Sequence, residues 1–588
     1  MAKHDNFRIN IYFVLVLAAA AVISYNLFVL TYIRHYSYSR TAQAHRENIS
    51  NVLARGNIYL RGEGPLQGGV SIEKYLIATN KKFPLAYIVP AEINTQDTTE
   101  IAGRISSVLG IDAYKVKDMI DSGSDKFRVL SRRIDDEQVA AIKALGIKGL
   151  GITYETDRYY PGGSLAAGIL GFLGYSGDKK SGQYGIEAFY DDELSSQCRD
   201  CRSVELFFIS LPSLFSFWDR GTENASTGRQ SWDGDGRPAD IVLTIDKNIQ
   251  QVAEDKLDVL MKKLEATGGT IIIQDPNTGK MLAMVDRPTF DPNNYSEYEP
   301  RNFLNRGVQE IFEPGSSFKP ITMAMGLDLG AITPQTTFND VGFRDEAGYR
   351  IKNFSEKVFG NVTMSEVLEK SVNTGAMYVQ DMVGNKNFLD YVINLGFGQG
   401  TGIDLPGEIH GNISNLYSGR KINFLTASFG QGIAVTPIQL INAYSAIANG
   451  GKLMKPYVVE KIVKEGGEEE ITQSEIVAIP ISEKTATKLK SMLVSVVDNG
   501  FDKARISGYD VAGKTGTAQI PDGKGGYSED EYIHDFVGFA PAFDPKFVIL
   551  IKIDKPKGIT FAADSLSPTF KEITQYLLNY YSIPPTRR

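Results

Sequence analysis

The sequence has few of the side chains that metal and thiol sites need. Its 588 residues include only two cysteines and five histidines, and three of the histidines fall within the first 45 residues. The remaining two, His410 and His534, argue against a His-based metal site and leave little material for a Ser-His-Asp triad. Two cysteines also exclude a thiolate cage and a disulfide-dense scaffold. We therefore predict neither a metal nor a cofactor.

The sequence also lacks an excess of positive charge. It carries 62 Lys and Arg against 70 Asp and Glu, which gives a formal net charge of −8. Nucleic-acid binding usually requires a basic surface, so we expect no nucleic-acid partner. With 42% hydrophobic and 22% charged residues, the chain is globular and long enough for several domains with their own cores.

One long apolar run lies near the N-terminus, at 11–33, and is about as long as a bilayer is thick. We predict a single transmembrane helix there. A cleaved signal peptide with a small-residue site near Ala18 to Ala21 is the alternative. Basic residues do not settle the orientation and slightly favour a cytoplasmic location for the chain that follows: Lys3 and Arg8 precede the run, and Arg34, Arg40 and Arg46 follow it.

The stretch at 312–320, FEPGSSFKP, has the features of a nucleophilic site. The Pro-Gly pair interrupts the preceding structure, and Ser316 can begin a helix on which Lys319 lies on the same face. A serine hydroxyl needs an adjacent base to become a good nucleophile, and a desolvated, neutral lysine can be that base. The helix start adds free backbone N–H groups and the positive end of a dipole, which suit a developing oxyanion.

The Ser-x-x-Lys spacing alone is a weak signal, because it also occurs at Ser71, Ser176 and Ser418. Ser316 is distinguished by two motifs that follow it over about two hundred residues: Ser371-Val372-Asn373 and Lys514-Thr515-Gly516-Thr517. Each motif alone could be an ordinary helix start, a chance match or a turn. In this order, however, they form the set found in penicillin-binding proteins and class A β-lactamases.

On these motifs the chain resembles a class B, or monofunctional, penicillin-binding protein, which is a peptidoglycan D,D-transpeptidase. The resemblance implies a short cytoplasmic tail at 1–10, a single membrane pass and an extracytoplasmic location, at the bacterial inner membrane, for everything after about residue 40. The sequence Glu-Pro-Gly-Ser at 313–316 and the asparagine at Asn373 favour the division and sporulation branch, and hence septal cell-wall synthesis.

Partners follow from the same resemblance. The expected ligands are peptidoglycan stem peptides ending in D-Ala-D-Ala, and β-lactam antibiotics. Because there is no room for a glycosyltransferase domain, glycan polymerisation would fall to a separate polytopic membrane polymerase of the shape, elongation, division and sporulation family.

The resemblance also assigns a catalytic role to three residues. Ser316 would attack the carbonyl between the last two D-alanines and form an acyl-enzyme, while Lys319 would take the hydroxyl proton. For this, burial and the charge of Lys514 would have to lower the pKa of Lys319. Ser371 would relay a proton to the leaving nitrogen.

The remaining motif residues would bind the substrate. Asn373 would hold the substrate amide and orient Lys319. The terminal carboxylate would be bound by Lys514, Thr515 and Thr517, and Gly516 would let the substrate backbone lie along the strand edge. The oxyanion hole would consist of the backbone N–H groups of Ser316 and Thr517.

The predicted fold class is α+β. Residues 41–240 would form an elongated, non-catalytic pedestal of the dimerisation type, and 241–588 a transpeptidase domain with an antiparallel sheet flanked by helices. The segments RGNIYLR at 55–61, RYYPG at 158–162 and YGIE at 184–187 are similar to pedestal motifs of the family, and we interpret them as turns and salt-bridged scaffold. Local patterns predict a helix from about Asp135 to Ala144, a hairpin around 276–279 and a last helix from about Ser567 to Tyr581.

Three features depart from the family pattern. In the motif at 55–61, Leu60 precedes the second arginine, at a position where an acidic residue is usual. Asp535 precedes Phe536 at a position where a small residue is expected. An insertion at about 198–232 carries Cys198 and Cys201, which could form a redox pair, close a loop or remain idle thiols. It also carries an apolar run at 207–218, which could pack in a core or contact a membrane or a partner protein.

Rival functions come from other classes. A membrane-anchored serine β-lactamase would share the three motifs, but it needs a base that activates water for deacylation. A β-lactam sensor or a catalytically silent division scaffold would be a binding module rather than an enzyme. The complete motifs argue against the scaffold, and the single predicted N-terminal span without a cytoplasmic signalling domain argues against the sensor.

Overall fold

The computed structural model describes residues 55–63, 72–93, 97–123, 127–176, 179–195, 238–521 and 526–587. The predicted membrane helix, the tail before it and the insertion with its two cysteines lie outside these ranges. Among the residues that are described, no helix is long and apolar enough to span a membrane. The described chain divides into two compact units, one made of 80–157 and the other of 55–79 with 158–587.

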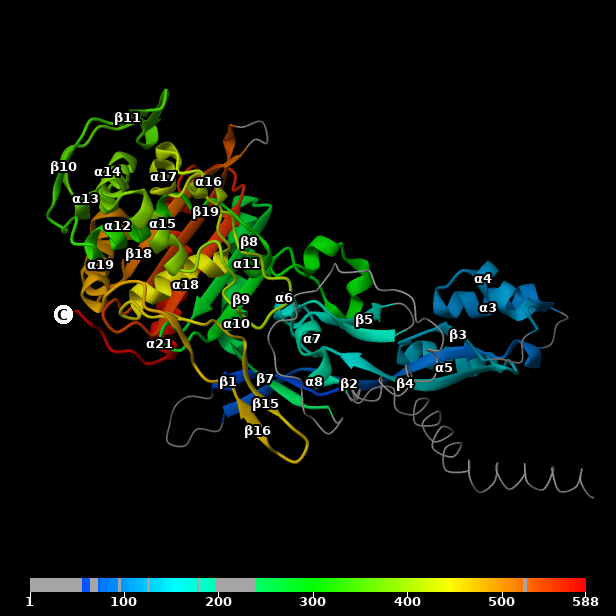
Figure 1. The fold of residues 1–588 in the computed structure, drawn as a ribbon. Helices are drawn as coiled ribbons and strands as arrows, with labels where there is room; N and C mark the ends of the chain where they lie inside the picture. The colour runs from blue at the N-terminus through cyan, green and yellow to red at the C-terminus, as the bar shows by residue number, and fades with distance from the viewer. Residues whose placement is uncertain are drawn as a thin grey trace, which may run out of the picture. The chain divides into compact units, whose positions relative to one another are not determined.

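The smaller unit packs three helices against short strands (Figure 1). Its elements are the end of β2 (Ile72–Ile88), α3 (Thr98–Leu109), α4 (Ala113–Asp121), β3 (Arg128–Ser131), α5 (Asp136–Leu145) and most of β4 (Leu150–Tyr159). The helix predicted from about Asp135 is confirmed as α5. Asp135 caps its start by accepting from the Gln138 N–H, and Gly146 ends it in the left-handed region at φ 61°.

In the larger unit, one sheet joins strands from distant parts of the sequence. Its order is β16 (Glu469–Ile471), β15 (Val459–Val463), β7 (Asp240–Asp246), β1 (Ile58–Glu63) and the first part of β2. β7 runs parallel to β1 and antiparallel to β15. The predicted domain boundary near residue 240 therefore falls at a strand that pairs with both neighbouring parts of the chain.

A buried ionic cluster holds the predicted pedestal motifs together. The Glu187 carboxylate accepts from Arg55 Nε at 2.6 Å and from Arg158 Nε at 2.7 Å, and Arg55 also pairs with Asp191 at 2.7 Å. Because an unpaired buried charge costs several kcal/mol, each of these groups depends on its partners. The prediction of a salt-bridged scaffold is confirmed. The surrounding elements are α6 (Ala167–Leu170), β5 (Phe172–Ser176), β6 (Lys179–Gln183), α7 (Gly185–Phe189) and α8 (Asp191–Leu194).

The part of the larger unit that follows residue 246 is built on a five-stranded antiparallel sheet. Its order is β18 (Ala512–Pro521), β19 (Tyr527–Ala540), β20 (Phe547–Asp554), β8 (Gly268–Gln274) and β9 (Met281–Arg287). The last two strands are the predicted hairpin, with its turn at 276–279. The α+β class predicted from the sequence is confirmed.

Helices cover both faces of this sheet (Figure 1). On one face, α10 (Lys247–Leu264) packs over Gly269, and α21 (Ser567–Tyr580) stacks Phe570 on Phe536 with ring centroids 4.2 Å apart. On the other face, α18 (Pro437–Ala448) bonds to Gln274, whose side chain donates to Asn442 at 3.0 Å. The predicted last helix is thus confirmed as α21.

The remaining helices of this part include those that carry residues of two of the three motifs. They are α11 (Arg306–Gln309), α12 (Lys319–Asp328), α13 (Met364–Glu369), α14 (Asn373–Val383), α15 (Asn385–Asn394), α16 (Ser414–Tyr417), α17 (Lys421–Ala427), α19 (Glu483–Ser495) and α20 (Ala562–Ser565). Short strand pairs lie among them: β10 (Thr337–Asp340) with β13 (Gly360–Thr363), β11 (Phe343–Glu346) with β12 (Tyr349–Lys352), and β14 (Leu453–Met454) with β17 (Ile476–Ala478).

Candidate active site

The Lys-Thr-Gly motif lies on β18, which is an edge strand of the five-stranded sheet. β18 also contacts the short 3-10 helix η6 (Gly315–Phe318), which carries Ser316. A Cβ built on Gly315 would lie 3.2 Å from the Thr517 carbonyl oxygen, so the start of η6 almost touches the strand. Gly315 also has φ 55°, a conformation that glycine adopts readily. The turn thus brings the nucleophile candidate beside Thr517.

Lys319 begins α12, one helical turn after Ser316. Its side chain is buried, and Nζ donates to the Ser371 carbonyl oxygen at 2.6 Å and to Ser371 Oγ at 3.1 Å. Burial and then the nearby charge of Lys514 hold the pKa of Lys319 well below its usual value. A neutral amine in contact with a hydroxyl is the arrangement that a lysine base requires.

Ser371 occupies an unusual backbone position at the end of α13. Its N–H bonds to the Leu368 carbonyl at 3.2 Å, and the Val372 N–H bonds to the Val367 carbonyl at 2.9 Å. These two bonds form a Schellman motif, in which the residue at the position of Ser371 is most often glycine. Ser371 adopts the left-handed conformation, φ 55°, in spite of its Cβ. The motif directs both its carbonyl and its hydroxyl towards Lys319.

Lys514 lies on β18 with a buried side chain. Its Nζ donates to the Thr515 carbonyl oxygen at 3.0 Å and lies 5.7 Å from the centre of the Phe501 ring. Burial lowers the pKa of Lys514 to about 8, and the opposing charge of Asp535 keeps it from falling further. Lys514 is therefore a cation that one more negative charge would stabilise.

Two predicted residues lie near the site without the expected hydrogen bonds. The Asn373 side chain donates to the Lys352 carbonyl at 3.0 Å, whereas both hydrogen bonds of the Lys319 amine go to Ser371. The expectation that Asn373 orients Lys319 is therefore not confirmed, because the end of α13 performs this task. The Ser316 hydroxyl has no hydrogen-bond partner among the described residues and lines a cavity.

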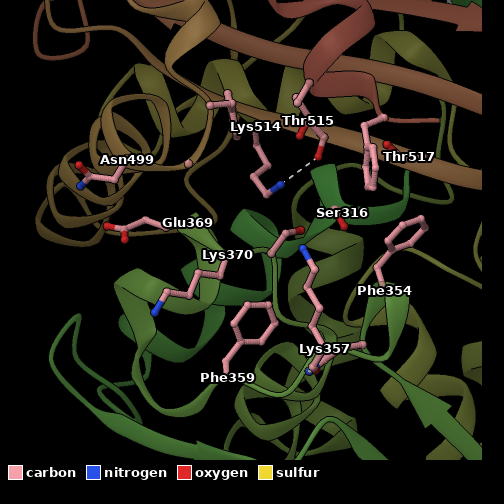
Figure 2. Close-up of a pocket in the computed structure, with 16 residues that line it drawn as sticks. Ser316, Phe354, Lys357, Phe359, Glu369, Lys370, Asn499, Lys514, Thr515 and Thr517 are labelled. Carbon is pink, nitrogen blue, oxygen red and sulfur yellow. Dashed lines mark hydrogen bonds between the residues drawn. The ribbon is translucent and has the colours of Figure 1, made fainter. Parts of the chain in front are cut away.

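This cavity, of about 410 Å³, is lined by five of the predicted site residues (Figure 2). They are Ser316, Ser371, Lys514, Thr515 and Thr517. Gly516 lies on the same strand and has no room for a side chain, since a Cβ would be 2.4 Å from the Pro314 carbonyl oxygen. The Thr517 hydroxyl accepts from the Ala562 N–H at 3.1 Å, which holds its oxygen in place.

Sequence reasoning missed the aromatic and basic residues that share the cavity: Phe354, Phe359, Phe501, Phe561, Lys357 and Lys370. None belongs to a motif, and they come from four separate segments. Phe354 and Phe561 contact each other edge to face at 5.2 Å, yet each is 44% exposed. A partly exposed aromatic pair at a polar cavity offers an apolar surface to a ligand.

Comparisons with known proteins point to the same family as the three sequence motifs. Residues 269–575 match the penicillin binding protein transpeptidase domain, and 53–198 match the penicillin-binding protein dimerisation domain. Stage V sporulation protein D of Bacillus subtilis is 33% identical over 536 residues, covering 90% of this chain and 79% of that protein. A probable peptidoglycan D,D-transpeptidase of Pseudomonas aeruginosa is 31% identical over 464 residues, covering 78% of this chain and 77% of the relative.

Solved structures agree. Penicillin binding protein 3 from Mycobacterium tuberculosis, complexed with aztreonam, superposes with a TM-score of 0.63 at 28% identity, covering 74% of this chain and 92% of the other. The chain belongs to the penicillin-binding proteins, and within them to the class B peptidoglycan D,D-transpeptidases. It is thus a serine-type transpeptidase that binds β-lactams.

Proposed function

We propose that Ser316 is the nucleophile and Lys319 its base. The observation that carries this assignment is the Lys319 amine, which is buried, depressed in pKa and bonded to Ser371, one helical turn from a serine whose hydroxyl faces the cavity. Ser316 Oγ would attack the carbonyl of the penultimate D-alanine while its proton passes to Lys319. The C–N bond to the last D-alanine then breaks, and D-alanine leaves with a proton relayed through the Ser371 hydroxyl.

The β18 edge would hold the substrate. Lys514 would pair with the terminal carboxylate, assisted by the hydroxyls of Thr515 and Thr517. An edge strand offers unpaired backbone groups, so an extended stem peptide can lie along the strand that contains Gly516. Asn373 would hold the substrate amide from the start of α14. The N–H groups of Ser316 and Thr517, close together because η6 contacts β18, would stabilise the oxyanion.

The acyl-enzyme would then transfer its acyl group to the amine of a second stem peptide, which forms the cross-link and regenerates the Ser316 hydroxyl. A β-lactam would acylate Ser316 in the same way, with its ring nitrogen as the leaving group. That nitrogen stays tethered to the acyl group, which explains why such an adduct blocks the site.

We also propose that the enzyme acts in septal wall synthesis, anchored by residues 11–33 with the catalytic part outside the inner membrane. Support comes from the Bacillus subtilis relative, named for sporulation, and from a relative named FtsI in Buchnera aphidicola that is 30% identical over 518 residues. The glycan strands would come from a polytopic polymerase of the shape, elongation, division and sporulation family, in contact with the membrane helix and the pedestal.

Labelling with a fluorescent penicillin tests the assignment on the full-length protein in detergent. Wild type should bind one label per chain and retain it for many minutes, whereas Ser316→Ala should stay unlabelled. Ser418→Ala is the matched control, because Ser418 begins another Ser-x-x-Lys sequence but is exposed, with its hydroxyl bonded to the Asn415 carbonyl at 2.6 Å.

Two results would contradict the proposal. Rapid loss of the label would indicate a β-lactamase. A folded wild-type protein that never labels would indicate a scaffold or a closed site.

A further inference from the structure

A row of polar residues crosses the five-stranded sheet, beginning next to β18, the strand that carries the Lys-Thr-Gly motif. Asp535 on β19 is directly opposite Gly516 on β18 and Lys552 on β20. Residues directly opposite each other in adjacent strands have their side chains on the same face of the sheet. The row continues through Thr270 and ends at Asp286 on β9, at the other edge. Asp535 is therefore the member of the row that adjoins the Lys-Thr-Gly strand.

The Asp535 carboxyl group fills the space under Gly516. Its side chain is completely buried, and a Cβ on Gly516 would lie 2.0 Å from Asp535 Oδ2. Neither carboxyl oxygen has a hydrogen-bond partner among the described residues. The Ser317 hydroxyl is close by, but it donates to the Pro314 carbonyl oxygen at 2.8 Å. A buried carboxyl without hydrogen bonds costs free energy, so a compensating interaction is expected.

Two lysines, Lys514 and Lys552, face Asp535, and they differ in whether they have another acidic partner. Lys552 is already paired with Asp554 at 2.5 Å and with Glu310 at 3.2 Å. Lys514, in contrast, donates only to a backbone carbonyl within the part of the chain that the structure describes. The remaining titratable neighbour is Tyr444 of α18, whose hydroxyl donates to the Ser317 carbonyl at 2.6 Å.

The charges are coupled in a definite direction. Burial raises the pKa of Asp535 to about 7, and the hydroxyl of Ser317 and the charges of Lys514 and Lys552 oppose this rise. Asp535 in turn raises the pKa of Lys514, which burial would otherwise lower below about 8. Lys514 then lowers the pKa of Lys319. Asp535 therefore affects the pKa of Lys514, the lysine proposed to bind the substrate carboxylate, and Lys514 affects the pKa of Lys319, the proposed base.

We propose that Asp535 is a positioning residue for the reaction: a buried counter-charge that keeps Lys514 protonated for binding of the substrate carboxylate. This inference rests on the proposed role of Lys514. It gives a function to the departure at this position, where the family resemblance predicts a small residue. Because Asp535 is shielded from the cavity by Gly516, it acts through Lys514 and does not touch the substrate.

The test is the pH profile of penicillin acylation of the full-length protein, from pH 6 to 10. Wild type should lose acylation rate above about pH 8, as Lys514 loses its proton. In Asp535→Asn and Asp535→Ser, the alkaline limb should move to lower pH by about one unit, because an opposite charge near a titrating group shifts its pKa by about that much or more. The loss should appear mainly in the binding constant for penicillin, with the limiting acylation rate less affected.

Asp286→Asn is the matched control. Asp286 is a partly buried carboxyl in the same row, but its strand, β9, is four strands from β18, which carries Lys514, or about 19 Å at the usual strand spacing. Its replacement should leave the alkaline limb in place. Asp535→Asn preserves the shape of the side chain, so it keeps the test valid should Asp535→Ser not fold. Variants that label but keep the wild-type limb would overturn this inference, whereas failure of wild type to label would overturn the proposed function.

Discussion

Replacing Ser371 by glycine and by alanine separates the work of its hydroxyl from the strain in its backbone. Both variants lose the hydroxyl that accepts from Lys319, so both should acylate more slowly, by about 10²- to 10⁴-fold, the usual contribution of a positioned proton donor or acceptor. Their stabilities should differ. At φ 55° alanine keeps a Cβ penalty of about 1–2 kcal/mol that glycine avoids, while glycine loses about 0.5–1 kcal/mol through its more flexible unfolded chain.

The net expectation is that Ser371→Gly is more stable than Ser371→Ala by up to about 1.5 kcal/mol. Unfolding in urea is best followed by circular dichroism. Tryptophan fluorescence would report on the insertion at about 198–232, because both tryptophans, Trp218 and Trp232, belong to it. Ser365, in the first turn of α13, supplies a control of opposite sign: there glycine should be less stable than alanine by up to about 1 kcal/mol, with labelling unchanged.

Two results would refute the reasoning. Near wild-type acylation by Ser371→Gly would show that no proton passes through this hydroxyl. An alanine variant more stable than the glycine variant would show that the left-handed turn at the end of α13 is not strained.

Three further predictions concern other parts of the larger unit. Gly516→Ala should fold but acylate about 10²-fold more slowly, since its Cβ would displace the strand from the Pro314 carbonyl, 2.4 Å away; unchanged labelling would contradict this. Glu187→Ala should lower the free energy of unfolding, measured in urea, by about 3–5 kcal/mol, because two buried arginines lose the carboxylate that they share. A loss under about 1 kcal/mol would contradict the stabilising role of the cluster. Burial lowers the pKa of His534 from 6.5 to about 4, so between these pH values the unfolded chain binds a proton that the folded chain does not. The free energy of unfolding should therefore fall by about 3 kcal/mol as the pH drops from 6.5 to 4. His534→Asn should flatten the dependence of Tm on pH.

The sequence by itself determined the features that depend on neighbouring residues. The capped helix α5 and the hairpin β8–β9 follow from residues within a few positions of one another, and the structure has both. The placement of Ser316 and Lys319 one helical turn apart is equally local, because it follows from their spacing in the sequence. The order of the three motifs then sufficed to predict the class of enzyme.

Tertiary structure decided what depends on contacts between distant segments. The strand β1 pairs with β7, some 180 residues later, and no short pattern in either strand specifies that partner. Ser371 could be predicted as a site residue, but its left-handed backbone and its bond to Lys319 required α12 and α13 to be packed together. The phenylalanines that line the cavity likewise come from separate segments that contain none of the three motifs.

Asp535 shows the difference most clearly. In the sequence it is one acidic residue before an apolar strand, whereas in the fold it is buried under Gly516 with Lys514 and Lys552 on either side. Charge interactions depend on distance and on exclusion of water, and both are set by how the strands of the sheet align. Local propensities cannot specify that alignment, because strand register arises from packing of the whole sheet face against its helices.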